Sequence, residues 1–152
     1  MTYFFAYGDR MSADRMAELM PDAKAVGPAR LPGYRLVFNV RSRAWGGGAA
    51  NAEVDPSSSM WGVLWDIGEQ DVAPFESTGD QANAPIDVTV EGPNGSVDAK
   101  TMAIWSGESF VRPTDRYVAM LRANAEKQGL PVEALAQIDA AAAGSYGQAP
   151  SI

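Results

Sequence analysis

Apolar residues along the chain first follow the short spacing that is typical of strands. Residues 2–7 (TYFFAY) are apolar and rich in aromatic side chains, which predicts a buried strand. Residues 60–67 (MWGVLWDI) predict a second strong strand. Residues 25–40 predict two strands around a bend at Pro32-Gly33, and a short strand is predicted near 50–54. Two more strands are predicted within residues 84–92 and 97–107, joined by the turn residues Pro93-Asn94-Gly95.

Helical spacing appears between and after these strands. Ser12 has the character of an N-cap, and the apolar residues that follow it have helical spacing up to Pro21. Residues 69–78 predict a short helix. Pro113-Thr114-Asp115 opens a helix that runs to Gln128 and ends at Gly129. A last helix opens at Pro131 and ends in the alanine run 140–143.

Strands and helices do not alternate regularly along the chain. About six strands with two short helices between them, followed by two helices at the end, predict an α+β fold with an antiparallel or mixed sheet, and a closed barrel is one form of it. We find neither an internal repeat nor a linker. We therefore expect a single domain over residues 1–152, with a peripheral tail after about residue 144.

Composition narrows the classes of function. The 12 basic and 19 acidic residues give a formal net charge of -7, which argues against nucleic acid or an anionic membrane surface as the main partner. The chain has neither cysteine nor histidine, which excludes thiolate and Ser-His nucleophiles and nearly all zinc sites. Acid–base chemistry must come from Asp, Glu, Tyr, Lys or the backbone. No segment approaches the roughly 18 apolar residues of a membrane span, and we expect a cytoplasmic protein.

The loop after the first strand is a candidate binding site. If a helix begins near Ser12, the backbone N–H groups of Asp9, Arg10 and Met11 lie just before its N-terminus, where they form a cradle for a carboxylate or an oxyanion. The alternative is a plain strand-to-helix turn in which Gly8 supplies a positive φ angle.

Three further features have both a functional and a structural interpretation. The run Gly46-Gly47-Gly48 allows a close approach of backbone to a ligand whose carboxylate Arg41 or Arg43 would hold, or it is an exposed loop. Tyr117 points into a pocket or packs in the core. The acidic residues around the short predicted helix supply a general acid–base group or form a solvated face; they are Glu69, Asp71, Glu76 and Asp80.

Four segments in register resemble the γ-glutamylcyclotransferase-like family: YFFAYGDRM, GPARLPGYRLVFN, WGGGAANAEVDPSSSMWGVLWDI and PTDRYVAML followed by GLP. The resemblance spans about residues 2–131. It implies a small mixed β-barrel flanked by helices, one pocket, and an amino-acid-like substrate. The sequence shows no metal constellation and no nucleotide-binding motif, so we expect no cofactor. The family's reaction closes 5-oxoproline when the α-amine of a γ-glutamyl group attacks its own γ-carbonyl carbon. The resemblance further implies that Tyr7, Gly8, Asp9, Arg10 and Met11 cradle the substrate and that Tyr117 lines the pocket.

The chain departs from the family's pattern at the proton-shuttling glutamate. Counted without gaps from Trp61-Gly62-Val63, the glutamate position falls on Gly79, which has no side chain. Glu76, Asp9 and Asp80 are the candidate replacements; in a helix, Glu76 lies on the same face as Gly79. The usual Ser-Asn of the first loop is Asp9-Arg10. Three interpretations remain open: a replaced carboxylate, an altered acyl transfer, or a non-catalytic binding protein.

Overall fold

The computed structural model describes residues 2–70, 84–106 and 108–145. In these ranges the order of elements is β1 (Thr2–Ala6), the 3₁₀ helix η1 (Asp9–Met11), α1 (Ala13–Leu19), β2 (Lys24–Ser42), β3 (Gly47–Gly68), β4 (Ala84–Gly92), β5 (Gly95–Ala103), α2 (Asp115–Lys127) and α3 (Val132–Ala142). The helix expected over 69–78 and the tail after residue 145 lie almost wholly outside the described residues. No helix within the described ranges has the length and apolar content to cross a membrane.

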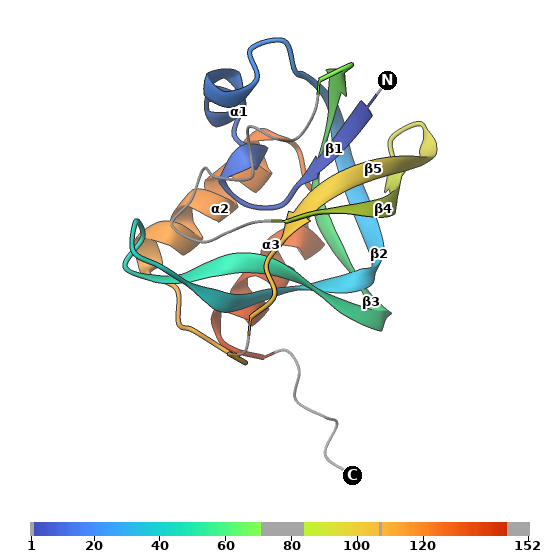
Figure 1. Ribbon diagram of the computed structural model, residues 1–152. Helices are drawn as coiled ribbons and strands as arrows, with labels where there is room; N and C mark the ends of the chain where they lie inside the picture. The colour runs from blue at the N-terminus through green and yellow to red at the C-terminus, as the bar shows by residue number, and fades with distance from the viewer. Residues whose placement is uncertain (1, 71–83, 107, 146–152) are drawn as a thin grey trace.

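The five strands close into a mixed barrel in the order β1-β3-β2-β4-β5 (Figure 1). Neighbouring strands are antiparallel except β1 and β5, which pair in parallel where Phe4 lies opposite Lys100. The helices lie to one side of the barrel, and the joined ends of β2 and β3 extend beside α2 (Figure 1). The predicted α+β class and the mixed barrel are both confirmed.

The barrel has five strands where about six were expected, because bends in β2 and β3 do not interrupt pairing. Pro32 pairs with Ser59, and Tyr34 pairs with Val54, so residues 55–58 bulge from β3 opposite the bend of β2. Gly33 makes this bend with a φ of 83°. Residues 55–58 are therefore a bulge within one long strand rather than a break between two strands.

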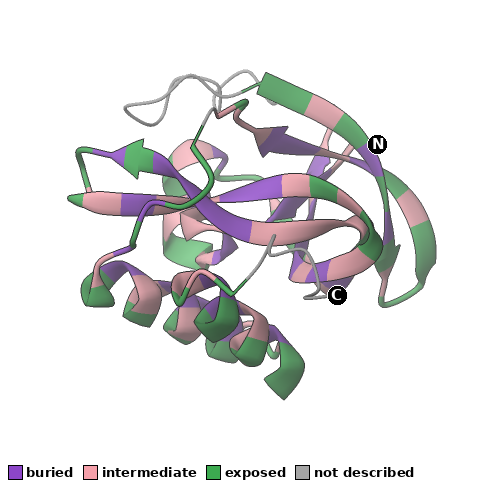
Figure 2. Cartoon of the chain, turned by 90° about the horizontal axis from the view of Figure 1, so that it is seen from below, coloured by how far each residue is buried: buried purple, intermediate pink, exposed green. Residues whose placement is uncertain are grey.

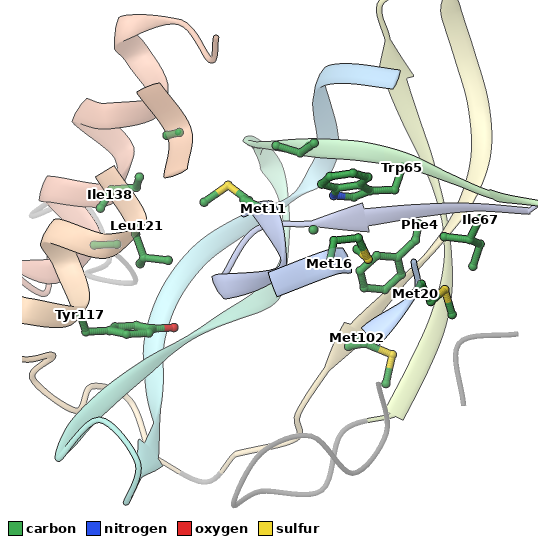
Figure 3. Close-up of a cluster of buried hydrophobic side chains, with 14 of the residues drawn as sticks. Phe4, Met11, Met16, Met20, Trp65, Ile67, Met102, Tyr117, Leu121 and Ile138 are labelled. Carbon is green, nitrogen blue, oxygen red and sulfur yellow. The ribbon is translucent and has the colours of Figure 1, made fainter. Parts of the chain in front are cut away.

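Alternating side chains of the strands divide the core into two clusters. Phe5 and Leu64 belong to a cluster made only of strand residues, which fills the barrel. Phe4 and Trp65 point to the other side, where they join residues of the helices, including Leu121 (Figure 3). The buried faces of the helices accordingly turn toward the sheet, and their outer faces are exposed (Figure 2). The apolar periodicity of α2 and α3 is thus satisfied against the barrel wall.

The helix starts follow the expected capping. The side chain of Ser12 accepts a hydrogen bond from the N–H of Arg15 at 3.3 Å, and that of Thr114 accepts one from the N–H of Tyr117 at 3.2 Å. These caps fix where α1 and α2 begin. They therefore also fix the positions of Arg15 and Tyr117, which lie one turn into their helices.

Candidate active site

A cavity of about 220 Å³ opens at the end of the barrel where β1, β2 and β5 end and β3 begins. Its size is below the roughly 300 Å³ at which pockets for drug-sized ligands start, so it suits a ligand of amino-acid size. Its lining comes from all of these strands, from the loop after β1, and from α1 and α2. The described lining residues are Phe4, Phe5, Ala6, Tyr7, Gly8, Asp9, Arg10, Arg15, Val40, Ser42, Ala44, Trp45, Ala49, Ala50, Thr101, Met102, Ile104 and Tyr117.

The loop after β1 forms one wall of this cavity. Gly8 has a φ of -119°, so the positive φ of the plain-turn interpretation is absent, and a Cβ added there would meet no protein atom within 4 Å. The N–H of Met11 donates to the carbonyl oxygen of Gly8 at 3.1 Å, and the Met11 side chain is 1% exposed in the core. Met11 is therefore not among the lining residues. The N–H groups of Asp9 and Arg10 belong to the first turn of η1, beside the cavity.

A hydrogen bond from helix α2 fixes the position of this loop. The side-chain amide of Gln128 donates to the carbonyl oxygen of Met11 at 2.9 Å. Because Gln128 caps the C-terminal end of α2 and Tyr117 lies near its N-terminal end, one helix positions two walls of the cavity.

Charged groups of the lining come from η1 and α1. Nε of Arg15 lies 3.1 Å from a carboxylate oxygen of Asp9, and the same guanidinium bonds Glu18 at 2.9 Å. Burial lowers the pKa of Arg10, while the nearby Asp9 carboxylate and Tyr7 phenol act in the opposite direction. Two basic side chains and one acidic side chain thus line the described part of the cavity.

Two tyrosines place their hydroxyl groups in this site. The Tyr7 hydroxyl donates to the carbonyl oxygen of Met102, and the Tyr117 oxygen accepts from the N–H of Ala50 at 2.9 Å. Burial is the main cause that raises the pKa of both phenols, and the positive charge of Arg10 only partly opposes it. Both therefore remain protonated at neutral pH and can act as hydrogen-bond donors. Tyr117 reaches from α2 toward the strands in Figure 3.

The glycine run packs against protein rather than opening to a ligand. A Cβ on Gly48 would lie 1.9 Å from the carbonyl oxygen of Val111, and the N–H of Gly48 donates to the carbonyl oxygen of Arg112 at 2.8 Å. This close approach replaces both earlier interpretations for Gly47 and Gly48, whereas Gly46 is exposed, as the loop interpretation expects. Arg41 is largely exposed and pairs with Glu108 at 2.8 Å, outside the cavity lining.

The hairpin between β2 and β3 nevertheless contributes an aromatic wall. The ring centroid of Trp45 lies 5.0 Å from that of Tyr117, and the guanidinium of Arg116 lies 4.7 Å from the Trp45 ring. Aromatic and cation–π contacts of this kind hold the indole in place. The hairpin tip is thereby fixed against the first turn of α2.

A buried asparagine holds the segment after β5, which reaches the cavity lining at Ile104. The side-chain amide of Asn51 donates to the carbonyl oxygen of Ile104 at 2.6 Å and accepts from the N–H of Ile104 at 3.0 Å. It also donates to the side-chain oxygen of Asn39 at 3.0 Å. The chain leaving β5 is therefore held to β3 by one side chain.

The structure brings some of the residues singled out in the sequence together, leaves others outside its described ranges, and adds residues that the sequence did not single out. Tyr7, Gly8, Asp9, Arg10 and Tyr117 come together around the cavity. Glu76, Gly79 and Asp80 lie outside the described residues. Arg15, Ser42, Thr101 and Met102 were missed, because only the closed barrel brings these scattered residues to one end; Trp45 lay within a recognised motif without a role assigned to it.

Comparison with known proteins finds similarity over most of the chain. Gamma-glutamylcyclotransferase from Bos taurus is 28% identical over 138 residues, covering 86% of this chain and 73% of that protein. Its counterpart from Homo sapiens is 26% identical over 137 residues, with the same coverage of 86% and 73%. A solved structure described as a gamma-glutamyl cyclotransferase has a TM-score of 0.81 at 23% identity, covering 91% of this chain and 86% of its own. That last likeness concerns the fold alone. No family model matches the chain.

Proposed function

Since the chain is a γ-glutamylcyclotransferase-like protein, we propose that it catalyses acyl transfer within a γ-glutamyl or similar aminoacyl amide. The α-amine nitrogen attacks the γ-carbonyl carbon, the amide C–N bond breaks, and the departing amine takes up a proton while 5-oxoproline or a related lactam is left. The observation that carries the proposal is a cavity of about 220 Å³ with a backbone turn and two protonated phenols in its wall.

The cavity would accelerate the reaction mainly by holding the substrate in a folded conformer. Ring closure is intramolecular, and fixing the amine against the carbonyl carbon removes much of the entropic cost of the attack. The ring of Trp45, fixed between Tyr117 and Arg116, supplies a rigid wall for this purpose. A small, shaped cavity therefore does much of what the reaction requires.

Stabilisation of the developing oxyanion falls to the loop after β1. The N–H groups of Asp9 and Arg10 in η1 are the donors beside the cavity, and a Gly8 without side chain leaves room above them. In an oxyanion hole each such donor contributes about 2.7–4 kcal/mol to lowering the barrier. The loop is held by Gln128, which limits its movement during the reaction.

The proton of the attacking amine needs an acceptor, and three carboxylates are candidates. Asp9 lines the described part of the cavity. Glu76 and Asp80 precede Ala84, which pairs with Ala103 at the cavity end of the barrel. We propose that one of these three replaces the glutamate whose position falls on Gly79.

The test is product release from γ-glutamyl amines and γ-glutamyl dipeptides, followed by mass spectrometry for 5-oxoproline. The variants Asp9→Asn, Glu76→Gln and Asp80→Asn, each with an intact circular dichroism spectrum, identify the acceptor by loss of turnover. Asp139→Asn, on the exposed pair with Arg122, is the matched control. Release at the wild-type rate by all three variants excludes them as the proton acceptor.

The alternative function is non-catalytic binding of an amino-acid-like molecule on the same fold. It is favoured by the absence of a side chain at Gly79, the position that the glutamate of the family would occupy. A ligand that raises the unfolding temperature without forming product would support this alternative. Turnover of any γ-glutamyl amide by the chain would exclude it.

A further inference from the structure

We propose that the Arg10 side chain is a specificity determinant of the cavity, and that it binds the α-carboxylate of the acyl group so that ligands without this carboxylate are rejected. The inference rests on the proposed function, in which the backbone of the same loop serves the γ-carbonyl oxygen. It assigns to the side chain a separate role on a separate atom of the ligand.

The first support is the position of the guanidinium. Arg10 lines the cavity and is only partly exposed, and its charge acts on the buried phenols of both Tyr7 and Tyr117. Both phenols are shielded from solvent, since burial is the main cause that raises their pKa. The charge of Arg10 therefore acts within the cavity lining, where a bound acyl group would meet it.

The second support is the distribution of charge around the cavity. The carboxylate of Asp9 bonds Arg15, and Arg15 also bonds Glu18, whose side chain is 66% exposed. These three groups form an ion-pair chain that runs outward from the cavity to the surface. Among the described lining residues, Arg10 and Arg15 carry a positive charge and Asp9 carries a negative one, in a chain whose net charge is -7. A local positive excess in an acidic protein favours an anionic ligand there.

The third support is the energetic state of Arg10 itself. Burial lowers its pKa, which means that the surroundings favour its charged form less than water does. A carboxylate bound beside it would restore that stabilisation, and the planar guanidinium can hold both carboxylate oxygens at once. The α-ammonium of a γ-glutamyl ligand must lose a proton to react, whereas its carboxylate stays charged throughout and can serve as a constant anchor.

A matched pair of ligands tests the inference without requiring turnover. 5-Oxoproline and 5-oxoprolinamide have the same ring and differ in the charge of one group. By titration calorimetry, the wild-type chain should bind the acid at least about 10-fold more tightly than the amide, as expected for a charge-assisted hydrogen bond. Arg10→Gln should remove this preference, because it weakens the binding of 5-oxoproline and leaves the binding of 5-oxoprolinamide unchanged. Arg30→Gln, on the exposed pair with Glu91, should keep it.

A second pair of ligands tests the same contact during the reaction. γ-Glutamyl anilide and 4-aminobutyryl anilide both cyclise, and only the first carries the α-carboxylate. Arg10→Gln should lower kcat/KM for the γ-glutamyl substrate by at least about 10-fold more than for its partner. If Arg10→Gln does not fold, Arg10→Lys replaces it in the test. This variant keeps the charge but loses the bidentate contact, so kcat/KM should fall by a smaller factor and only for the substrate that carries the carboxylate.

The outcomes separate this inference from the proposed function. The inference is overturned, even if cyclisation occurs, if Arg10→Gln weakens the binding of 5-oxoproline and 5-oxoprolinamide equally. It is also overturned if the wild-type chain binds both with the same affinity. Absence of cyclisation with every substrate overturns the proposed function, and the calorimetric comparison then still decides whether Arg10 reads a carboxylate.

Discussion

The phenol oxygen of Tyr117 in α2 accepts the backbone N–H of Ala50 in β3 at 2.9 Å. This contact joins the first turn of a helix to a strand at the cavity wall. Tyr117→Phe keeps the ring contacts and leaves the Ala50 N–H without its acceptor. The free energy of unfolding should fall by about 1–3 kcal/mol, measured by urea denaturation.

The matched control for this prediction is Tyr34→Phe, at a half-buried tyrosine of β2 outside the cavity lining. Its cost should stay within about 0.5 kcal/mol, as for substitutions away from buried hydrogen bonds. An equal cost in the two variants would contradict the importance that we assign to the Ala50 contact.

Alkaline titration should reveal the buried phenols directly. The chain has five tyrosines, and burial raises the pKa of Tyr7 and Tyr117 above the usual 10.0. Because these phenols ionise more readily in the unfolded chain, their contribution to stability is complete below about pH 10 and falls as the pH rises above that value. Absorbance at the tyrosinate band should show these two groups ionising only together with unfolding. Their ionisation in the folded chain near pH 10 would refute the burial.

Two glycines should respond in opposite ways to an added methyl group. Gly48→Ala places a Cβ 1.9 Å from the Val111 carbonyl oxygen and should unfold the chain or lower its stability by about 1–3 kcal/mol, as overpacking does. Gly8→Ala meets no protein atom and should keep the unfolding temperature while weakening binding of 5-oxoproline. Thermal denaturation and calorimetry check the two parts, and full ligand affinity in Gly8→Ala would place the ligand elsewhere.

The tether from α2 to the first loop should matter for binding more than for stability. Gln128→Leu removes the hydrogen bond to the Met11 carbonyl oxygen and should raise KM or Kd, because η1 loses its fixed position. Gln137→Leu is the control, since its amide accepts from the N–H of Trp61 and donates to the carbonyl oxygen of Ser59, away from the cavity. Both should cost about 1 kcal/mol of stability. A similar loss of binding in both variants would refute a specific role for Gln128.

Local signals in the sequence predicted much of this fold, and contacts between distant segments decided the rest. The helix starts at Ser12 and at Pro113-Thr114-Asp115 were visible because a helix start depends on its immediate neighbours. The role of Gly48 was not visible in the sequence. A side chain is excluded there by the backbone of Val111, which lies far along the chain. In the same way, the loop residues Gly8 and Arg10 were found from their neighbours, whereas Arg15 joins the site only through its position on a packed helix.

The hydrogen bonds between Asn51 and both backbone groups of Ile104 have a consequence for how this scaffold can change. Beyond Ala103 a side chain, rather than a neighbouring strand, takes both polar groups of the backbone. Asn51 is buried and is not a lining residue, so its replacement would leave the N–H and the carbonyl oxygen of Ile104 without partners rather than reshape the cavity. Evolution of this scaffold toward a new substrate is therefore expected to spare position 51 and to act on lining residues such as Ile104.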